Sequence, residues 1–445
     1  MEYLEWMRGL VWGPCLLLAL FGTGILCTIR LGGFQFFRFA TWWKATAGEI
    51  GTGKKEQLLT SCTALAATVG TGNIVGVATA LSVGGPGAVF WMWVSAFFGM
   101  ATAYAEVYLG IRYRKRGKDG LWIAGPFLCL ENGLDRGVWG RLYAGFVILA
   151  SLGMGSMVQA NSAVESLEFV WGIHPLLSGL IITALVGLVI FGGVGRIAGA
   201  ASVLVPVSAG LYLFFGGIAV FSQYERIPMV LALIVKSAVG IESAVGGVAG
   251  YTVQQAIGSG VSRGVFSNEA GLGSLAVLHG NAGEGETPES QGMWAVFEVF
   301  FDTIVCCSLT AMILLCVGGE DIFMPGKPAG AAAVAACFSF CFGPAGGWMT
   351  AICLVLFAFA TIIAWFYLGR QAVSWLAEKR LAPYLLGGYG FLYLGAVLAG
   401  CLGRLEAVWA ISDIFNGLMA IPNLAAVAGL LSQVKAPKIK RPLQQ

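Results

Sequence analysis

Four consecutive small or polar residues, Gly70-Thr71-Gly72-Asn73, interrupt an apolar segment that is otherwise long enough to cross a bilayer. Glycine costs about 1 kcal/mol relative to alanine in a helix interior, and hydrocarbon cannot satisfy the Asn73 amide. Non-helical backbone at membrane depth is tolerated only where it is buried in protein or lines a water-filled cavity. The break therefore predicts a binding site. The freed N–H groups of its outer half suit an anion, and the freed C=O groups of its inner half suit a cation.

A kink for close helix packing is the alternative interpretation of these glycines, because Gly72 and Gly76 have the spacing of a small-residue packing motif. However, the eleven residues that end at Asn73 also hold three threonines: Thr63, Thr68 and Thr71. Packing alone does not require so many polar groups, so the pattern favours a binding site.

The composition identifies the chain as a membrane protein. Of its 445 residues, 58% are hydrophobic and 11% are charged, and the mean hydropathy is +0.81. Soluble proteins carry about 25% charged residues. The 65 glycines are spread through apolar segments, which predicts helices packed backbone to backbone with some breaks.

The cysteine and histidine patterns argue against a metalloprotein or an enzyme. The 11 cysteines have no metal-ligand spacing, and only two histidines are present, which argues against zinc or haem. No Ser/His/Asp or HExxH constellation lies at one depth, so we expect no catalytic activity. The basic residues fall in loops between apolar segments, which gives no support to nucleic-acid binding.

Stretches of about 20 apolar residues predict an all-α polytopic membrane protein with about eleven transmembrane helices and no separate soluble domain. The expected spans are 11–29, 57–83, 86–111, 141–170, 175–193, 200–222, about 240–278, 291–318, 345–368, 384–402 and 406–432. A shorter apolar piece at 327–341 is expected to be re-entrant or interfacial. The seventh span is irregular, because its second half, 258–273, is rich in glycine and polar residues.

The lysines and arginines predict the orientation, because they are enriched in cytoplasmic loops. All but five of the 26 fall on one side of the expected spans. The five exceptions, on or near the other side, are Arg8, Arg226, Lys236, Lys327 and Arg404. The N-terminus is therefore expected outside and the C-terminus in the cytoplasm, which requires an odd number of spans.

Three motifs make the chain resemble a known family. TVGTGNI at 68–74, GPGAVFWMW at 85–93 and GVFSNEAG at 264–271 are similar to the signature of the alanine or glycine:cation symporters, the sodium:alanine symporters. The resemblance extends from the first helix to the last. It implies a leucine-transporter-like fold, with two five-helix inverted repeats around a substrate site near the bilayer midplane. The repeats would cover 57–222 and 240–432 within the single domain 1–445, with 11–29 as an extra helix.

The resemblance also implies a function: a secondary active transporter in the bacterial inner membrane that couples sodium influx to uptake of alanine or glycine. The substrate carboxylate would meet the N–H groups of Thr71, Gly72 and Asn73. The sodium ion would take C=O groups around Ala66 and Val69. No organic cofactor is expected, and the partners are the small substrate and membrane lipid.

The remaining site residues lie on three other spans. Gln159 and Asn161 are polar residues in the fourth span, and either a substrate contact or an interhelical hydrogen bond would explain them. By resemblance, Thr361 lies beside the sodium ion and Trp365 beside the substrate side chain. The two are four residues apart, on one helix face.

The second break, expected at Gly258–Gly273, falls in the first helix of the second repeat. By resemblance, Phe266 and Asn268 join the substrate pocket. Ser267 or Asn268 could instead cap a helix in a cytoplasmic loop. Glu269 and Arg263 are a candidate gating ion pair on the inner side.

Four further ionisable residues lie within or near spans. Glu106 and Asp413 are expected near helix ends. Glu298 and Asp302 are four residues apart on one face, so they would repel each other unless one is protonated or paired. The preferred interpretation places this pair near the cytoplasmic vestibule.

Several alternatives stay open from the sequence. Protons could replace sodium, and the substrate could be serine or D-alanine. A channel is a weaker alternative, because a selectivity filter usually repeats around an axis of several subunits. The oligomeric state is not determined.

The predicted orientation can be tested with reporter fusions. A reporter fused after Gln445 should read cytoplasmic, and one inserted at Lys327 should read external. If both reporters lie on the same side of the membrane, the helix count is wrong.

Overall fold

The computed structural model describes residues 2–49, 55–117, 120–240, 253–319, 330–378, 380–403 and 405–437. In this part of the chain nearly all regular structure is helical, and the strands are two short ones that form a single antiparallel hairpin.

From the N-terminus to residue 240, the elements are α1 (Glu2–Val11), α2 (Pro14–Arg30), α3 (Phe34–Phe37), α4 (Phe39–Ala45), η1 (Ala47–Glu49), α5 (Lys55–Thr68), η2 (Thr71–Asn73), α6 (Val75–Gly84), α7 (Gly87–Tyr113), β1 (Lys115–Arg116), β2 (Trp122–Ile123), α8 (Pro126–Leu128), η3 (Cys129–Gly133), α9 (Gly137–Leu152), η4 (Gly153–Val158), α10 (Gln159–Trp171), α11 (Pro175–Ile190), α12 (Val194–Phe221), η5 (Tyr224–Arg226) and α13 (Ile227–Ala238). From residue 253 onward, they are α14 (Val253–Asn268), α15 (Ser274–Leu278), η6 (His279–Asn281), α16 (Pro288–Val299), η7 (Phe300–Cys307), α17 (Ser308–Met312), η8 (Ile313–Gly318), α18 (Gly330–Phe342), α19 (Pro344–Leu376), α20 (Ala382–Leu402), α21 (Leu405–Leu430) and η10 (Leu431–Gln433).

The all-α polytopic fold is confirmed. Among the described residues, eight helical stretches are long and apolar enough to cross a membrane. The pair α5 and α6, bent by 49° at the first break, forms a ninth candidate span. The other two expected spans are helical but shorter: α11 and α14 have 16 residues each. The start of the predicted second repeat borders residues 241–252, which lie outside the described residues.

The structure adds elements that hydropathy did not predict. The loop after α7 forms the β1–β2 hairpin, and α13 is an additional short helix that packs on α7. The apolar piece expected at 327–341 is the 13-residue helix α18 where it is described, from residue 330 onward. Helical hydropathy finds spans well, but short amphipathic helices and hairpins lack a comparable signal.

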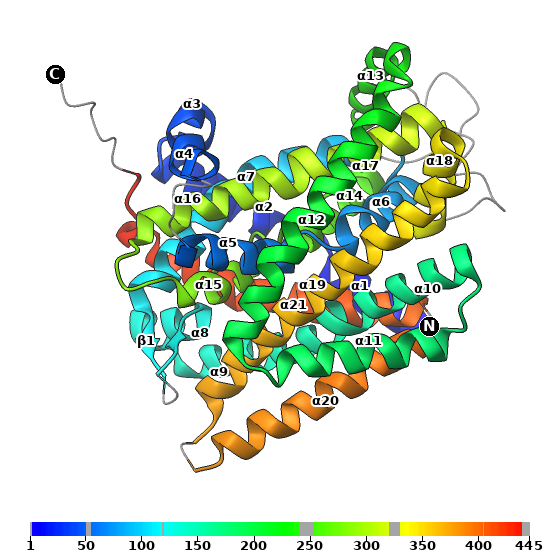
Figure 1. Ribbon diagram of the computed structural model, residues 1–445. Coiled ribbons are helices and arrows are strands. Elements are labelled where there is room, and N and C mark those ends of the chain that lie inside the picture. The colour runs from blue at the N-terminus through cyan, green and yellow to red at the C-terminus, as the bar shows by residue number, and fades with distance from the viewer. Residues whose placement is uncertain are drawn as a thin grey trace.

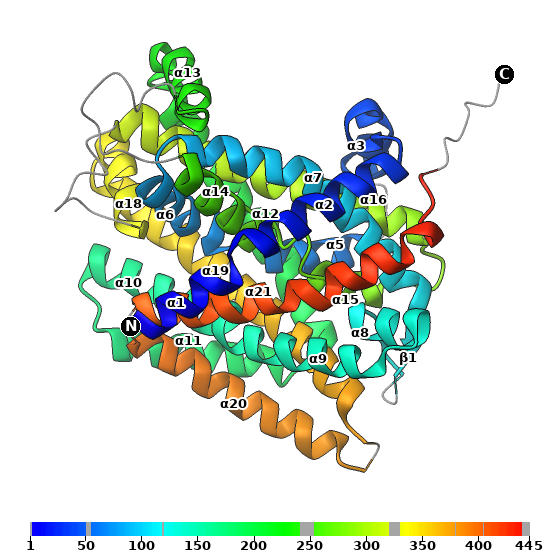
Figure 2. The same ribbon diagram turned by 180° about the vertical axis from the view of Figure 1, so that it is seen from behind.

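The long helices run in roughly one direction, so the molecule has two ends (Figures 1 and 2). Helices α7 and α16 lie side by side along one flank and α20 lies along the opposite one, with α19 and α21 between them. One end carries α3, α4 and the hairpin, where many of the basic residues are found. The other end carries the N-terminus, α10, α13 and α18. We call these the basic end and the N-terminal end.

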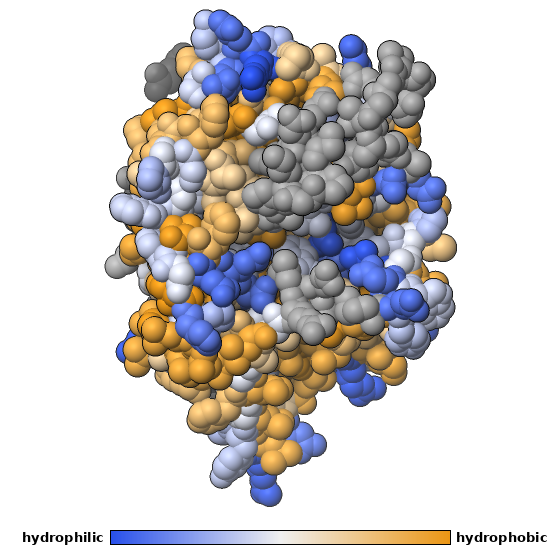
Figure 3. Space-filling view, turned by 90° about the vertical axis from the view of Figure 1, so that its right-hand side faces the viewer, coloured by the Kyte–Doolittle hydropathy of each residue, from blue (hydrophilic) through white to orange (hydrophobic). Residues whose placement is uncertain are grey.

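The N-terminal end is seen face-on in Figure 3. Polar residues gather in the middle of this face, and apolar residues dominate below them. This pattern suits a helix bundle whose flanks meet lipid while its ends meet water. Which end is cytoplasmic remains a prediction from the basic residues.

Close approach of helices explains part of the glycine content. A Cβ added to Gly400 of α20 would lie 2.4 Å from Cα and 2.6 Å from the carbonyl oxygen of Met157 in η4. Such contacts involve backbone, which cannot rotate away. On the same helix, Gly395 is exposed and has no atom within 4 Å of the corresponding position.

These two glycines provide a matched test of the packing. Gly400→Ala should destabilise the purified protein by about 1–3 kcal/mol, because overpacking forces the helices apart. Gly395→Ala should be neutral or slightly stabilising, because alanine favours helix. Thermal unfolding in detergent measures both. Equal stabilities of the two variants would contradict the close α20–η4 contact.

Candidate functional site

The first break is built by hydrogen bonds from its own asparagine. The N–H of Gly70 donates to Oδ1 of Asn73 (2.8 Å) rather than to the carbonyl of Ala66, four residues before it. The N–H of Asn73 donates to the carbonyl of Gly70 (3.3 Å) rather than to that of Val69. The carbonyls of Ala66 and Val69 therefore lose the partners that a continuous helix would give them. Both residues are buried.

Thr361 of α19 lies directly against this break. A Cβ on Gly70 would lie 2.5 Å from the Thr361 hydroxyl oxygen. That hydroxyl donates to the carbonyl of Phe357 within its own helix (3.0 Å), which leaves its lone pairs available to a cation. The structure thus places Thr361 beside the same break as the two released carbonyls.

Gln159 also reaches the first break, from the start of α10. Its Oε1 accepts from both the N–H (3.2 Å) and the hydroxyl (2.8 Å) of Thr71. Its amide nitrogen donates to the carbonyl of Met154, inside the π-helical turn η4. The neighbouring Asn161 instead donates to the carbonyls of Gly400 and Gly403. Of the two polar residues, Gln159 lies at the break and Asn161 makes an interhelical bond.

The second break is narrower than expected. Residues 253–268 form one continuous helix, so the predicted break at Gly258–Gly273 is wrong over its first part. The chain leaves the helix at Glu269, which has a φ of 59°, and re-enters at Ser274. The opened carbonyls have side-chain donors: the Tyr143 hydroxyl donates to Leu272 (2.9 Å), and the Asn423 amide donates to Gly271 (2.9 Å).

At Gly72 the first break meets the end of α14, just before the second break. A Cβ at this position would lie 3.3 Å from Cα of Ser267 and 3.4 Å from the ring of Phe266. Phe266 therefore borders the first break, and the ring of Trp409 stacks on it with the two centroids 4.9 Å apart. The Asn268 side chain does not contribute to this contact: its amide donates to the Thr303 hydroxyl (2.9 Å) of η7.

Asp302 is the residue that the sequence interpretation missed. Its Oδ1 accepts from Nδ2 of Asn73 (2.6 Å) in the first break and from the hydroxyl of Ser267 (3.1 Å) beside the second. Oδ2 accepts from Thr303 (2.9 Å), and the residue is fully buried. The expected place near the cytoplasmic vestibule is wrong for Asp302, because its carboxyl group bonds to Asn73 in the first break and to Ser267 beside the second. An ionisable residue inside a span was the available signal.

The expected repulsion between Glu298 and Asp302 is relieved by separate partners. Asp302 is held by the three side chains just described, and Glu298 pairs with His279 at 3.0 Å. The two carboxyl groups therefore belong to different networks.

The predicted ion pair between Arg263 and Glu269 is wrong. Arg263 makes a buried bidentate pair with Asp413 of α21, at 3.0 and 2.7 Å. Its guanidinium also lies over the ring of Trp409, 4.7 Å from the centroid. The carbonyl of Asp413 accepts from the indole of Trp12 (2.8 Å), which places this cluster near the N-terminal segment.

Trp365 binds Glu269 instead. Its indole nitrogen donates to Oε1 of Glu269 (2.9 Å), and its side chain lies against Gly155, where a Cβ would come within 2.3 Å. Trp365 is fully buried at the edge of the second break. Among the described residues, no ring contact joins it to Phe266. Its role as the wall of a substrate pocket therefore stays a prediction.

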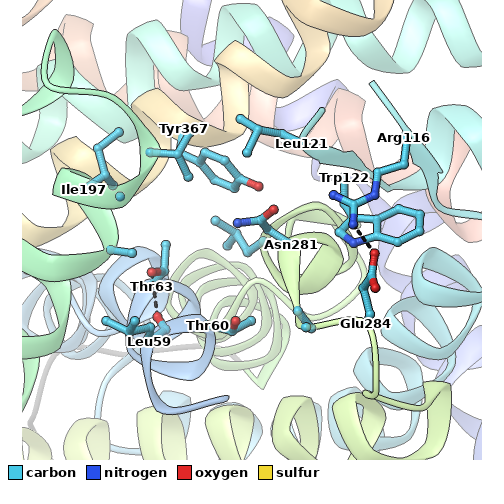
Figure 4. A pocket seen from close by; sticks show the side chains of 16 residues that line it. Leu59, Thr60, Thr63, Arg116, Leu121, Trp122, Ile197, Asn281, Glu284 and Tyr367 are labelled. Atoms are coloured by element: carbon cyan, nitrogen blue, oxygen red, sulfur yellow. Dashed lines mark hydrogen bonds and ion pairs between the residues drawn. The ribbon is translucent and has the colours of Figure 1, made fainter. Parts of the chain in front are cut away.

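A cavity of about 440 Å³ opens on the basic side of the first break. Its walls come from α5, α12, η6 and α19, and the Tyr367 hydroxyl and the Asn281 amide face its middle (Figure 4). The ion pair of Arg116 and Glu284 borders it. Its wall residue Thr63 is three positions before Ala66, on the same helix. We call this cavity the vestibule.

Comparisons with known proteins agree with this architecture. The family model described as "Sodium:alanine symporter family" matches residues 1–441. The chain is 40% identical to an uncharacterized transporter of Haemophilus influenzae, covering 94% of this chain and 91% of that protein. It is 38% identical to the sodium/alanine symporter AgcS of Methanococcus maripaludis, covering 98% and 95%.

Among solved structures, a Na⁺-coupled sialic acid symporter in a substrate-bound outward-open state superimposes with a TM-score of 0.56. The match covers 96% of this chain and 99% of that one, at 12% sequence identity, so it concerns the fold alone. Together with two broken helices that meet at the centre of an all-α membrane bundle, the family match shows that this chain belongs to the sodium:alanine symporter family and is a transporter rather than an enzyme.

Proposed function

We propose that this transporter couples the inward movement of sodium to the uptake of a small neutral amino acid, alanine or glycine. The observation that carries the proposal is the geometry of the first break. Two carbonyls without their helical partners, at Ala66 and Val69, border the same break as the hydroxyl of Thr361. Hard oxygen ligands of this kind suit a hard cation such as sodium.

The substrate carboxylate would bind at the start of the outer half-helix. The N–H groups of Thr71, Gly72 and Asn73 point along this half-helix, whose N-terminus carries partial positive charge. The Thr71 N–H is bonded to Gln159, so an arriving carboxylate would share or replace this acceptor. Gln159 would thus accept the Thr71 N–H whenever no substrate carboxylate is bound.

The substrate side chain would be limited by two aromatic residues. Phe266 lies against Gly72, and Trp365 lies against Gly155 beside the second break. Asn268 fits a supporting role better than direct substrate contact, since its amide is bonded to Thr303 and its Oδ1 accepts from Ala270. A pocket closed by two such rings would accept a side chain near the size of a methyl group.

Release toward the cytoplasm would use the vestibule. It lies on the basic side of Ala66, and its wall includes polar groups of Thr63, Asn281 and Tyr367. On the opposite side, Arg263 and Asp413 form a buried ion pair that would close the site there. A site closed on one side, with a polar cavity on the other, suits alternating access.

The proposed function is tested by counterflow of labelled alanine in proteoliposomes, with and without a sodium gradient. Uptake that rises with the sodium gradient supports the proposal. Uptake that follows a proton gradient alone, or that exchanges glutamine-sized substrates in preference to alanine and glycine, contradicts it.

The sodium site can be tested with two threonines of α19. Thr361→Val should raise the sodium concentration for half-maximal uptake about tenfold or more, equivalent to about 1.4 kcal/mol. Thr350 is the matched control, because it is equally buried and its hydroxyl bonds to Gly346 four residues back, as Thr361 bonds to Phe357. Thr350→Val should leave the sodium dependence unchanged. The same sodium dependence in both variants would remove Thr361 from the site.

Selectivity tests the position of Trp365. Trp365→Ala should weaken alanine binding and improve binding of valine or leucine, since one methylene in an apolar pocket changes discrimination by about 1–3 kcal/mol. Trp365→Phe keeps most of the ring but loses the bond to Glu269, so it separates pocket size from that hydrogen bond. Competition assays on monodisperse protein give the rank order. If the order of alanine, valine and leucine is unchanged in Trp365→Ala, the residue does not line the pocket.

A further inference from the structure

A fully buried histidine lies behind the vestibule with a hydrogen-bond partner on each ring nitrogen. Nδ1 of His279 lies 2.8 Å from Oε1 of Gln291, and Nε2 lies 3.0 Å from Oε2 of Glu298. All three side chains are fully buried. The remaining end of Gln291, its amide nitrogen, donates to Oε2 of Glu286 (3.0 Å).

This chain of bonds determines where protons must lie. Glu286 is an acceptor, so it fixes the amide nitrogen of Gln291 toward itself and the amide oxygen toward His279. Nδ1 of His279 must then carry a proton. If that were the only proton shared by the ring and the carboxylate, Nε2 would point its lone pair at an ionised Glu298. The observed 3.0 Å contact therefore requires a second proton between Nε2 and Oε2.

We propose that His279 and Glu298 form a proton-binding site, which holds one proton between the inner half of the second broken helix and α16. Loss of that proton puts a lone pair against a carboxylate in a dry environment, which drives η6 away from α16. The second carboxyl oxygen, Oε1 of Glu298, has no hydrogen-bond partner among the described residues, so no other donor in that part of the chain competes with His279 for this carboxyl group.

The groups around the pair come from every neighbouring element. Cys62 of α5 and Glu269 of the second break lie close enough to Glu298 to interact electrostatically, and Glu286 does so with His279. On α7, the ring of Tyr104 packs at Gly292, next to Gln291.

A basic group also lies beside this segment: the guanidinium of Arg114 donates to the carbonyls of Gly280, Ala282 and Gly283. It is bound to backbone directly after His279 rather than to the pair itself. The acidic groups Glu286 and Glu269 lie near the pair, whereas the guanidinium of Arg114 is held by the backbone that follows His279.

The site is placed to affect transport. Glu298 precedes Asp302 by one helical turn, and Asp302 bonds to Asn73 and Ser267 at the two breaks. Cys62 lies on the inner half-helix whose far end forms the first break. Gain or loss of the proton held by His279 and Glu298 would therefore move both inner half-helices. This consequence for transport rests on the proposed function.

The chain contains two histidines, which makes direct detection possible. His174 is exposed and accepts from the N–H of Leu176 through Nδ1 (3.2 Å), so it serves as an internal reference. In ¹⁵N-histidine-labelled full-length protein at pH 8, the ring-nitrogen signals of His174 are assigned by their loss in His174→Gln. The His279 pair should keep its extra proton, seen as a second protonated ring nitrogen or as a protonated-carboxyl infrared band that Glu298→Gln removes. A neutral ring beside an ionised Glu298 overturns the proposal.

Transport provides the second readout. With a fixed sodium gradient, wild-type alanine uptake should change with cytoplasmic-side pH, and His279→Gln should flatten this profile while His174→Gln keeps it. Identical profiles in all three proteins would overturn the transport part. If His279→Gln does not fold, the spectroscopic result on the wild type still decides. The spectroscopy does not depend on substrate identity, so failure of the sodium-coupled function and failure of the proton site are distinguishable.

Discussion

Hydrocarbon offers no hydrogen-bond partner to a backbone N–H or C=O group, so any helix that opens inside a membrane must be satisfied by other protein groups. This constraint shapes the centre of the structure. At the first break, Asn73 and Gln159 supply side-chain oxygens to the backbone of Gly70 and Thr71. At the second, Tyr143 and Asn423 supply donors to the opened carbonyls. The carbonyls that lose their helical donors at the first break include those of Ala66 and Val69.

Asp302 joins the two breaks into one unit. Because it accepts from Asn73 and Ser267 together, a shift of either broken helix changes the environment of the same carboxyl group. The two breaks have different surroundings toward the two ends of the molecule. Toward the N-terminal end, Arg263 and Asp413 form a buried bidentate pair under Trp409, whereas toward the basic end the vestibule approaches the break. This asymmetry is what alternating access requires of a single conformation.

The sequence predicted the helices and their breaks better than it predicted which side chains bond to each other. The first break and the contact of Gln159 follow from polar groups in apolar segments, which have few places to lie. The position of Thr361 beside the break was implied by the family resemblance, and its role there stays a prediction. The bonding partners of the charged side chains could not be predicted in the same way. Arg263 was paired with Glu269, six residues away, but a helix that continues to Asn268 directs Arg263 toward α21. The position of Asp302 was missed because hydropathy does not say which helix a polar face meets. The π-helical turns at η4 and η7, which carry Gly155 and Asp302, likewise have no hydropathy signal.

The central claim is that sodium and substrate share one site built from the two breaks. If so, binding of one must strengthen binding of the other by the same factor, because equilibrium coupling is reciprocal. The most direct measurement is alanine affinity of the purified protein at several sodium concentrations, together with sodium affinity at several alanine concentrations. Equal coupling factors, well above one, are expected in both titrations. Alanine affinity that does not change with sodium would contradict it.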